Sequence, residues 1–290
     1  MPAAWAEPLH SPRDKVAIQQ GVAAFEQADY QQAISAFSRA VEFNPSSAVA
    51  YSNRCLTYLQ LGQPTAAVSD CTQGLRLNPD MAEPYLNRGL AYYRLGQYGD
   101  AIADYQRLID RHPDDHRAYY NLGLAQSALG NHTAALEIYG IALHHTVASN
   151  APAEAKIYND RGVAYLHLER YKAALADFTQ ALALDTDVNN SVRAYFNRAC
   201  CYQHLKEYLL AIQDLSRVLS ATPDDARTYL ARGVVHHQLG DRWAAIADWR
   251  EAAHYFQTHH ELAAYQATLE LIETLQRASP ETPETMVLAI

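Results

Sequence analysis

Five arginines in this 290-residue sequence are each followed, sixteen positions later, by an aspartate. The pairs are Arg54 with Asp70, Arg88 with Asp104, Arg161 with Asp177, Arg198 with Asp214, and Arg232 with Asp248. A planar guanidinium can bind a carboxylate through two parallel hydrogen bonds, so each pair has the chemistry of a bidentate ion pair. Buried charges are normally paired. We therefore predict that these residues are structural ion pairs and not ligand-binding groups.

A tyrosine repeat defines the elements that must hold these pairs. The tyrosines are spaced 34, 34, 39, 37 and 34 residues apart, at Tyr51, Tyr85, Tyr119, Tyr158, Tyr195 and Tyr229. After each tyrosine come a small residue four positions on, an alanine sixteen positions on, and a bulky or apolar residue four positions later. A period near 34 is typical of a helix–turn–helix solenoid. The arginine, three residues after the tyrosine, would then face its aspartate across one helical hairpin.

The pattern of tyrosine, Asn-Arg-Gly, alanine, aromatic and closing proline resembles the tetratricopeptide repeat family. The Asn-Arg-Gly stretches are similar to those of bacterial, including cyanobacterial, members. The resemblance implies an all-α, right-handed superhelical solenoid of seven repeats, which we number 1 to 7. Their ranges are 14–47, 48–81, 82–115, 116–149, 155–188, 192–225 and 226–259. Repeats 1 and 4 carry neither the arginine nor the aspartate, so the two residues appear and disappear together.

The segments outside the repeats complete the predicted organisation. Residues 1–13 are expected to be a flexible lead, although Ser11 and Pro12 have the pattern of a helix start. Residues 260–278 carry an apolar stripe, Leu262, Tyr265, Leu269, Ile272 and Leu275, typical of a capping helix. Residues 279–290 are expected to be a flexible tail. The extra residues around 149–154 and at 189–191 are expected to lengthen loops between repeats.

The family binds extended peptides in a concave groove lined by the first helix of each repeat, and the resemblance implies such a surface here. The candidate groove residues are Asn53, Asn87, Arg117, Asn121, Lys156, Asp160, Arg193, Asn197 and Arg227. Bases and asparagines one helical turn apart could donate hydrogen bonds to a peptide backbone and its acidic side chains. The alternative that these are solvated surface charges stays open.

The four cysteines do not form the framework of a disulfide-rich protein. Cys55 and Cys71 are expected on facing helices of repeat 2, and Cys200 and Cys201 are adjacent. In a chain without a recognisable secretory signal we expect thiols packed at helix contacts. No paired Cys-x-x-Cys motifs predict a zinc site. Phosphate-binding loops, nucleophile elbows and His-Glu-x-x-His are absent too, so we predict no catalytic residues, metal or cofactor.

Charge and hydropathy narrow the class of partner. The net charge of −9 disfavours nucleic acid, because nucleic-acid-binding proteins usually carry a basic excess. No apolar run approaches the roughly 18 residues of a membrane span. We predict a cytoplasmic, non-enzymatic scaffold that binds an extended or helical, acidic segment of another protein. A self-assembling structural protein is the alternative, and an RNA-binding helical array is a more distant one.

Overall fold

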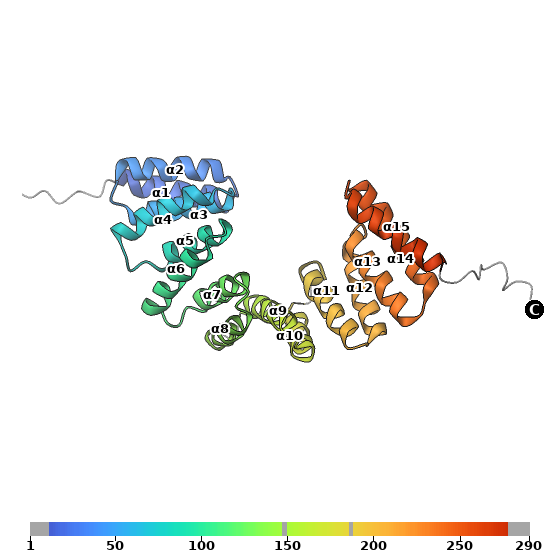
Figure 1. The fold of residues 1–290 in the computed structure, drawn as a ribbon. Helices are drawn as coiled ribbons and strands as arrows, with labels where there is room; N and C mark the ends of the chain where they lie inside the picture. Colours follow the sequence, from blue (N-terminus) through green and yellow to red (C-terminus); the bar gives the residue numbers. More distant parts are fainter. Residues whose placement is uncertain (1–11, 147–149, 186–187, 278–290) are drawn as a thin grey trace, which may run out of the picture. The chain divides into compact units, whose positions relative to one another are not determined.

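The structure is a computed structural model that describes residues 12–146, 150–185 and 188–277. These ranges form fifteen α-helices and contain no strand (Figure 1). The chain divides into two compact units, unit 1 up to Thr146 and unit 2 from Val147, and each is described by itself.

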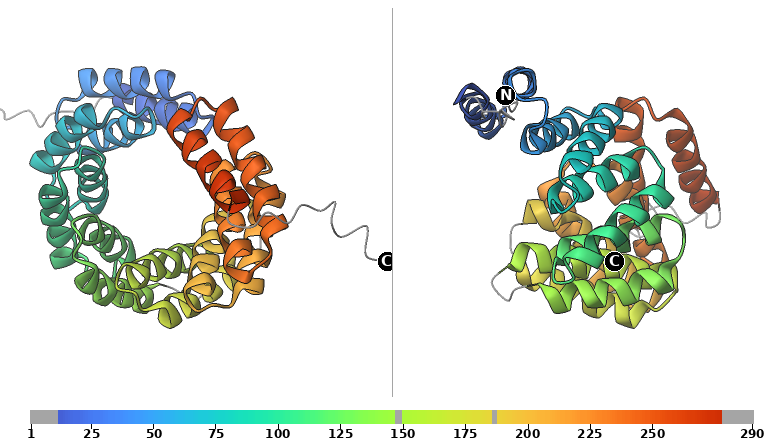
Figure 2. Two further views of the ribbon diagram at one scale, coloured as in Figure 1. Left: turned by 45° about the vertical axis from the view of Figure 1, so that its right-hand side comes forward. Right: turned by 90° about the vertical axis from the view of Figure 1, so that its left-hand side faces the viewer.

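Unit 1 holds four helical hairpins. They are α1 (Pro12–Glu26) with α2 (Tyr30–Phe43), α3 (Ala48–Gln60) with α4 (Pro64–Leu77), α5 (Ala82–Arg94) with α6 (Tyr98–Arg111), and α7 (His116–Ala128) with α8 (His132–His145). Helices α2, α4 and α6 also pack against the first helix of the next hairpin, α3, α5 and α7 respectively (Figure 2). The four hairpins correspond to repeats 1 to 4, and their stacking order follows the sequence.

Unit 2 holds three hairpins and a final helix. They are α9 (Ala151–His167) with α10 (Tyr171–Leu184), α11 (Val188–His204) with α12 (Tyr208–Ala221), and α13 (Ala226–Leu239) with α14 (Arg242–Thr258), followed by α15 (Leu262–Arg277). Helix α15 packs against α14. The predicted all-α repeat solenoid is therefore confirmed in both units.

The hairpin turns share one backbone conformation. Gly62 and Gly96 have φ values of +69° and +73°, in the left-handed region that favours glycine. The equivalent turn residues of repeats 1, 5 and 6 are Ala28, Glu169 and Lys206, and they adopt φ values between 55° and 62°. Non-glycine residues take up this less favourable region because the repeat geometry requires it.

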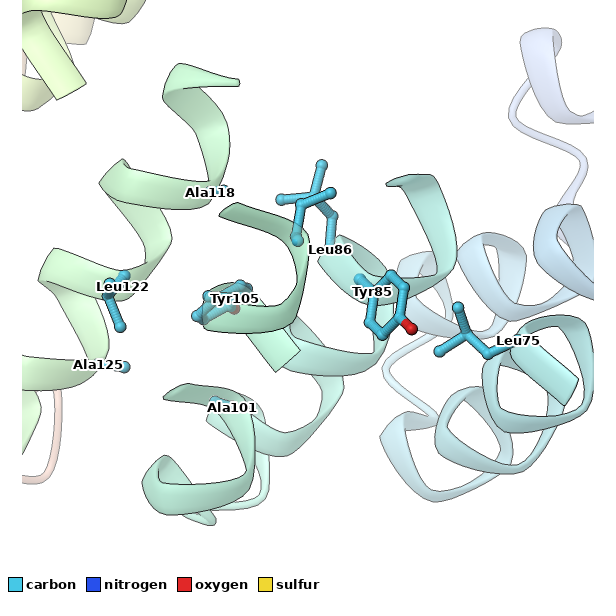
Figure 3. Close-up of a cluster of buried hydrophobic side chains, with 9 residues drawn as sticks. Leu75, Tyr85, Leu86, Ala101, Tyr105, Ala118, Leu122 and Ala125 are labelled. Atoms are coloured by element: carbon cyan, nitrogen blue, oxygen red, sulfur yellow. The ribbon is translucent and has the colours of Figure 1, made fainter. Parts of the chain in front are cut away.

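Small residues bring the two helices of each hairpin together. The second helix of each hairpin carries an alanine at this contact. It is fully buried in all seven repeats, at Ala33, Ala67, Ala101, Ala135, Ala174, Ala211 and Ala245. In repeat 3 a Cβ added at Gly89 would lie 2.4 Å from the Tyr105 ring. Figure 3 shows that ring between its own hairpin and Leu122 of α7. The core therefore continues from one hairpin to the next.

The extra residues between repeats are helical where the structure describes them, so the predicted loop insertions are wrong. Residues 151–154 extend the start of α9 and residues 189–191 lie inside α11, making both helices 17 residues long. Pro152 and Glu154 explain the first extension. A proline in the first turn loses no helical hydrogen bond, and an acid there is stabilised by the helix dipole.

The capping helix packs as predicted, except at its first residue. Tyr265, Leu269, Ile272 and Leu275 join apolar clusters with α13 and α14. Leu262, the first residue of α15, is 63% exposed, so its expected place in the stripe is wrong. The predicted lead and tail lie outside the described residues, apart from the start of α1. Among the described helices none is long and apolar enough to cross a membrane.

Candidate functional site

All five predicted arginine–aspartate pairs are in contact, each with two hydrogen bonds. In every pair the arginine Nε donates to Oδ2 and Nη2 donates to Oδ1, at distances between 2.6 and 2.9 Å. The carboxylates are nearly covered: the side chain of Asp104 is 2% exposed and that of Asp70 is 10% exposed. This geometry makes the pairs strong and directional interhelical contacts.

Four of these arginines also reach the preceding hairpin, and one of them, Arg198, donates from Nη1 to the Thr179 hydroxyl at 3.4 Å. The Nη1 groups of Arg54, Arg88 and Arg232 donate to the hydroxyls of Ser38, Thr72 and Ser216, at 2.9 to 3.0 Å. Each of these arginines therefore joins three helices. Because their donors are used within the scaffold, the ion pairs hold the stack together and are unsuited to binding a ligand.

Four of the six tyrosines that define the repeat lie against the ion-pair arginine of their own repeat. The guanidinium carbons of Arg54, Arg161, Arg198 and Arg232 lie 5.3 to 5.6 Å from the ring centroids of Tyr51, Tyr158, Tyr195 and Tyr229. Burial acts to lower the pKa of Arg88, but the hydrogen bond and charge of Asp104 outweigh it, so the pKa rises. The arginines stay charged, and this favours both the ion pair and the cation–π contact.

In unit 1 the candidate groove residues are largely engaged within the protein. Arg117 on α7 donates to Glu83 at 2.9 Å and to Asp115 at 2.8 and 3.0 Å. The hydrogen bond with Asp115 is the main cause of the raised pKa of Arg117. The side-chain amide of Asn121 donates to the Arg117 carbonyl at 2.9 Å. Arg117 is therefore not the open cation that the sequence predicted.

The two other candidates in unit 1 are asparagines of unequal exposure. Asn87 on α5 is buried, at 8% exposure, whereas Asn53 on α3 is half-buried. An amide that neighbouring helices cover cannot reach a peptide without a rearrangement. Asn53 is the better placed of the two to donate to a ligand.

In unit 2 two of the five candidates are open cations. Lys156 on α9 and Arg193 on α11 are exposed, and neither forms an ion pair within residues 150–185 and 188–277. Arg227 on α13 lies 3.4 Å from Glu261. Asp160 accepts a hydrogen bond from Asn159 at 3.1 Å, and Asn197 is half-buried.

An ion-pair pattern between repeats, which sequence reasoning missed, explains these differences. Arg117 follows Glu83 by 34 residues, and Glu261 follows Arg227 by 34, so both ion pairs join equivalent positions of consecutive repeats. Lys156 and Arg193 also occupy this position in consecutive repeats, but they carry the same charge. The sequence signal for such ion pairs is an acid and a base 34 residues apart, at equivalent positions of consecutive repeats.

Cys55 and Cys71 form a disulfide bond, so the predicted pair of free thiols is wrong. Their Cα atoms are 5.4 Å apart, within the usual range for a disulfide. The two residues are sixteen apart, as in the ion pairs, and directly follow Arg54 and Asp70. The offset that brings arginine to aspartate therefore brings one sulfur to the other.

The remaining cysteines, Cys200 and Cys201 on α11, are free thiols. Burial raises the pKa of both, that of Cys201 to about 12. A thiol in this state is largely protonated at neutral pH and therefore reacts slowly. Within the described part of the chain, no cluster of three histidine, cysteine or acidic residues could hold a metal ion.

Models of one protein family match both units. The matching models are described as tetratricopeptide repeat and cover residues 18–83 and 86–144 in unit 1, and 155–187 and 192–225 in unit 2. The matches end within or next to the hairpins described above. These matches show the family that the tyrosine spacing first suggested.

Solved structures show the same architecture. MamA protein is 25% identical, with a TM-score of 0.51 over 59% of this chain and 91% of that chain. YrrB, described as a TPR protein with an unusual peptide-binding site, is 20% identical, with a TM-score of 0.55 over 68% of this chain and 96% of its own. A tetratricopeptide repeat protein from Parabacteroides merdae is 17% identical, with a TM-score of 0.63 over 89% and 99%. The similarity to YrrB and to the Parabacteroides merdae protein shows a shared fold and does not show a shared function.

Proposed function

Because the chain belongs to the tetratricopeptide repeat family, we propose that it is a scaffold that binds another protein through the first helices of its repeats. The family and the solved relatives are non-enzymatic interaction scaffolds, which supports a binding role over a catalytic one. The peptide-binding site attributed to YrrB supports a peptide-like segment as the ligand. The segment we propose is acidic and either extended or helical.

The observation that carries this proposal is the open pair of cations in unit 2. Glu83 neutralises Arg117, and Glu261 approaches Arg227, but Lys156 and Arg193 form no ion pair among the described residues. Packed helices lie about 10 Å apart. An extended chain in the polyproline II conformation advances about 3.1 Å per residue with three residues per turn, so acids three residues apart on a partner would lie on one face and match neighbouring repeats.

A labelled peptide with glutamates three residues apart tests this proposal by fluorescence polarisation. Replacing Lys156 and Arg193 together by glutamate should weaken binding at least ten-fold, because two attractive contacts become repulsive. The melting temperature should stay nearly constant, since both side chains are exposed. Arg227→Glu is the matched control and should have a smaller effect, because Glu261 already lies near that charge. Equal affinity of the wild type and the double variant would exclude this site.

Self-association is a second candidate function, favoured by exposed apolar residues in unit 2. Leu209 on α12 and Trp243 on α14 are 71% and 55% exposed. They occupy equivalent positions of repeats 6 and 7, where unit 1 has polar or small residues, Gln31, Thr65, Gly99 and Thr133. Exposed apolar groups at neighbouring positions favour contact with another surface. A sedimentation coefficient that rises with concentration, and does so less in Leu209→Ser/Trp243→Ser, would support it.

A further inference from the structure

In every hairpin two residues that directly follow the arginine and aspartate positions meet between the two helices. This contact is filled differently in repeat 2 than in the other repeats. Five repeats place an aromatic ring against a glycine at this position: Gly21 with Phe37, Gly89 with Tyr105, Gly123 with Tyr139, Gly162 with Phe178, and Gly233 with Trp249. A Cβ added to any of these glycines would lie 2.4 to 2.7 Å from the ring. Repeat 6 has Ala199 and Leu215, both buried. Repeat 2 has the Cys55–Cys71 disulfide.

The disulfide supplies what the ring supplies elsewhere. Phe, Tyr and Trp rings fill the space between the two helices and contribute a large buried area. Two cysteines have far fewer side-chain atoms, and both are fully buried at this position. Once the bond is broken, the two sulfurs must move apart to van der Waals distance. Repeat 2 has no aromatic ring to fill the space between its helices. Reduction therefore removes the covalent link and leaves the poorest packing of any hairpin at this position.

We propose that the Cys55–Cys71 bond is a redox-operated lock on repeat 2, closed by exchange with a disulfide oxidant, which is reduced to two thiols, and opened by a dithiol reductant. In the opening step, one reductant thiolate attacks a sulfur of the bond, and the mixed disulfide is then displaced by the second reductant thiol. The protein disulfide gains two electrons and two protons and becomes two thiols. The dithiol loses the same number and becomes a disulfide.

Burial places this reaction under the control of helix packing. Both cysteines are 0% exposed, so a reductant reaches the sulfurs only when α3 and α4 separate locally. Arg54 and Asp70 directly precede the cysteines on their helices, and the hydrogen bond of Arg54 to Ser38 links this hairpin to α2. Opening would therefore be local to repeat 2 and would loosen its contact with repeat 1.

The lock would also control a binding face of unit 1. Helix α3 carries Asn53, a half-buried candidate of that unit that is more exposed than Asn87. Loosening α3 would change the position of this side chain, whereas the candidates of unit 2 lie in a separate compact unit. The lock itself does not depend on the proposed partner. It requires only the bond and the packing around it.

Thiol counting on the full chain tests whether the bond forms. Denatured, unreduced protein should show two reactive thiols, from Cys200 and Cys201, and four after treatment with dithiothreitol. Four thiols in protein purified without reductant and exposed to air or oxidised glutathione would overturn the proposal, because no closed state would then exist.

Hydrogen exchange with and without dithiothreitol tests whether the bond acts as a lock. Amides of residues 48–77 should exchange at least ten-fold faster in the reduced protein, while those of α13 and α14 should be unchanged. The matched control is Cys55→Gly/Cys71→Phe, which restores the glycine–ring contact of the other repeats and should show no response to reductant. Cys55→Ser gives a second open form, should exchange like the reduced wild type, and would confirm the assignment. Unchanged exchange of residues 48–77 on reduction would refute the lock.

Discussion

Repeats 2 and 3 carry the same ion pair but differ at the next position along the helix. Arg54–Asp70 and Arg88–Asp104 have matching bidentate geometry, and both arginines donate to a hydroxyl of the preceding hairpin. Directly beside the ion pair, repeat 2 has a disulfide, whereas repeat 3 has Gly89 against the Tyr105 ring. The fold fixes which positions face each other across a hairpin. The chemistry used there, whether ionic, covalent or steric, is free to differ between neighbouring repeats.

Removing the ring should have the largest effect in this comparison. Tyr105 is 1% exposed and lies among Ala101, Leu108 and Leu122. Tyr105→Ala should lower the free energy of unfolding by about 4 kcal/mol, because it leaves a cavity beside a glycine that cannot fill it. Cys71→Ala, measured against reduced wild-type protein, should cost only about 1 kcal/mol, because few buried atoms are lost. Urea unfolding followed by circular dichroism checks both values, and equal losses would contradict the comparison.

Breaking the ion pair should have the next largest effect. Arg88→Ala should cost about 3 kcal/mol, because it leaves the carboxylate of Asp104 buried without a partner. Arg88→Met/Asp104→Leu should recover much of that loss, since it removes both charges while keeping apolar volume. A double-mutant cycle of Arg88→Met, Asp104→Leu and their combination, measured by chemical unfolding, gives the coupling. Additive losses in this cycle would show that the two side chains do not stabilise each other.

The same pair of repeats shows which features the sequence could reveal. Arg88 and Asp104 were predictable because a sixteen-residue offset on two antiparallel helices fixes their approach, and both residues recur in other repeats. Cys55 and Cys71 share that offset, yet we expected two free thiols. A bond depends on the sulfur-to-sulfur approach as well as on helix register, and it occurs in a single repeat, so periodicity offered no comparison.

The predicted groove was less accessible to sequence reasoning than the scaffold. Arg117 looked like a free base, but it is bound by Asp115, two residues before it, and by Glu83 of the previous repeat. Leu262 fitted the apolar stripe, yet its side chain is 63% exposed. In both cases the outcome depends on which surface the adjacent helix covers, and helical periodicity within one element does not contain that information.

The smallest effect should come from adding one methyl group at the glycine–ring contact. In Gly89→Ala the new Cβ would meet the Tyr105 ring at 2.4 Å, so the ring or the helices must move. Overpacking of this kind costs about 2 kcal/mol. Alanine recovers about 1 kcal/mol through its better helix propensity, so the net loss should be about 1 kcal/mol.

Repeat 6 provides the matched control for this last prediction, because Ala199 and Leu215 already occupy the same two positions there and both are buried. Gly89→Ala should therefore be less harmful when Tyr105 is replaced by leucine, since the shorter side chain leaves room for the methyl group. The cycle of Gly89→Ala, Tyr105→Leu and their combination should give a favourable coupling of about 1 kcal/mol in urea unfolding. Zero coupling would mean that the ring does not press on the glycine. The size of the side chain opposite would then not explain why repeat 3 uses glycine where repeat 6 uses alanine.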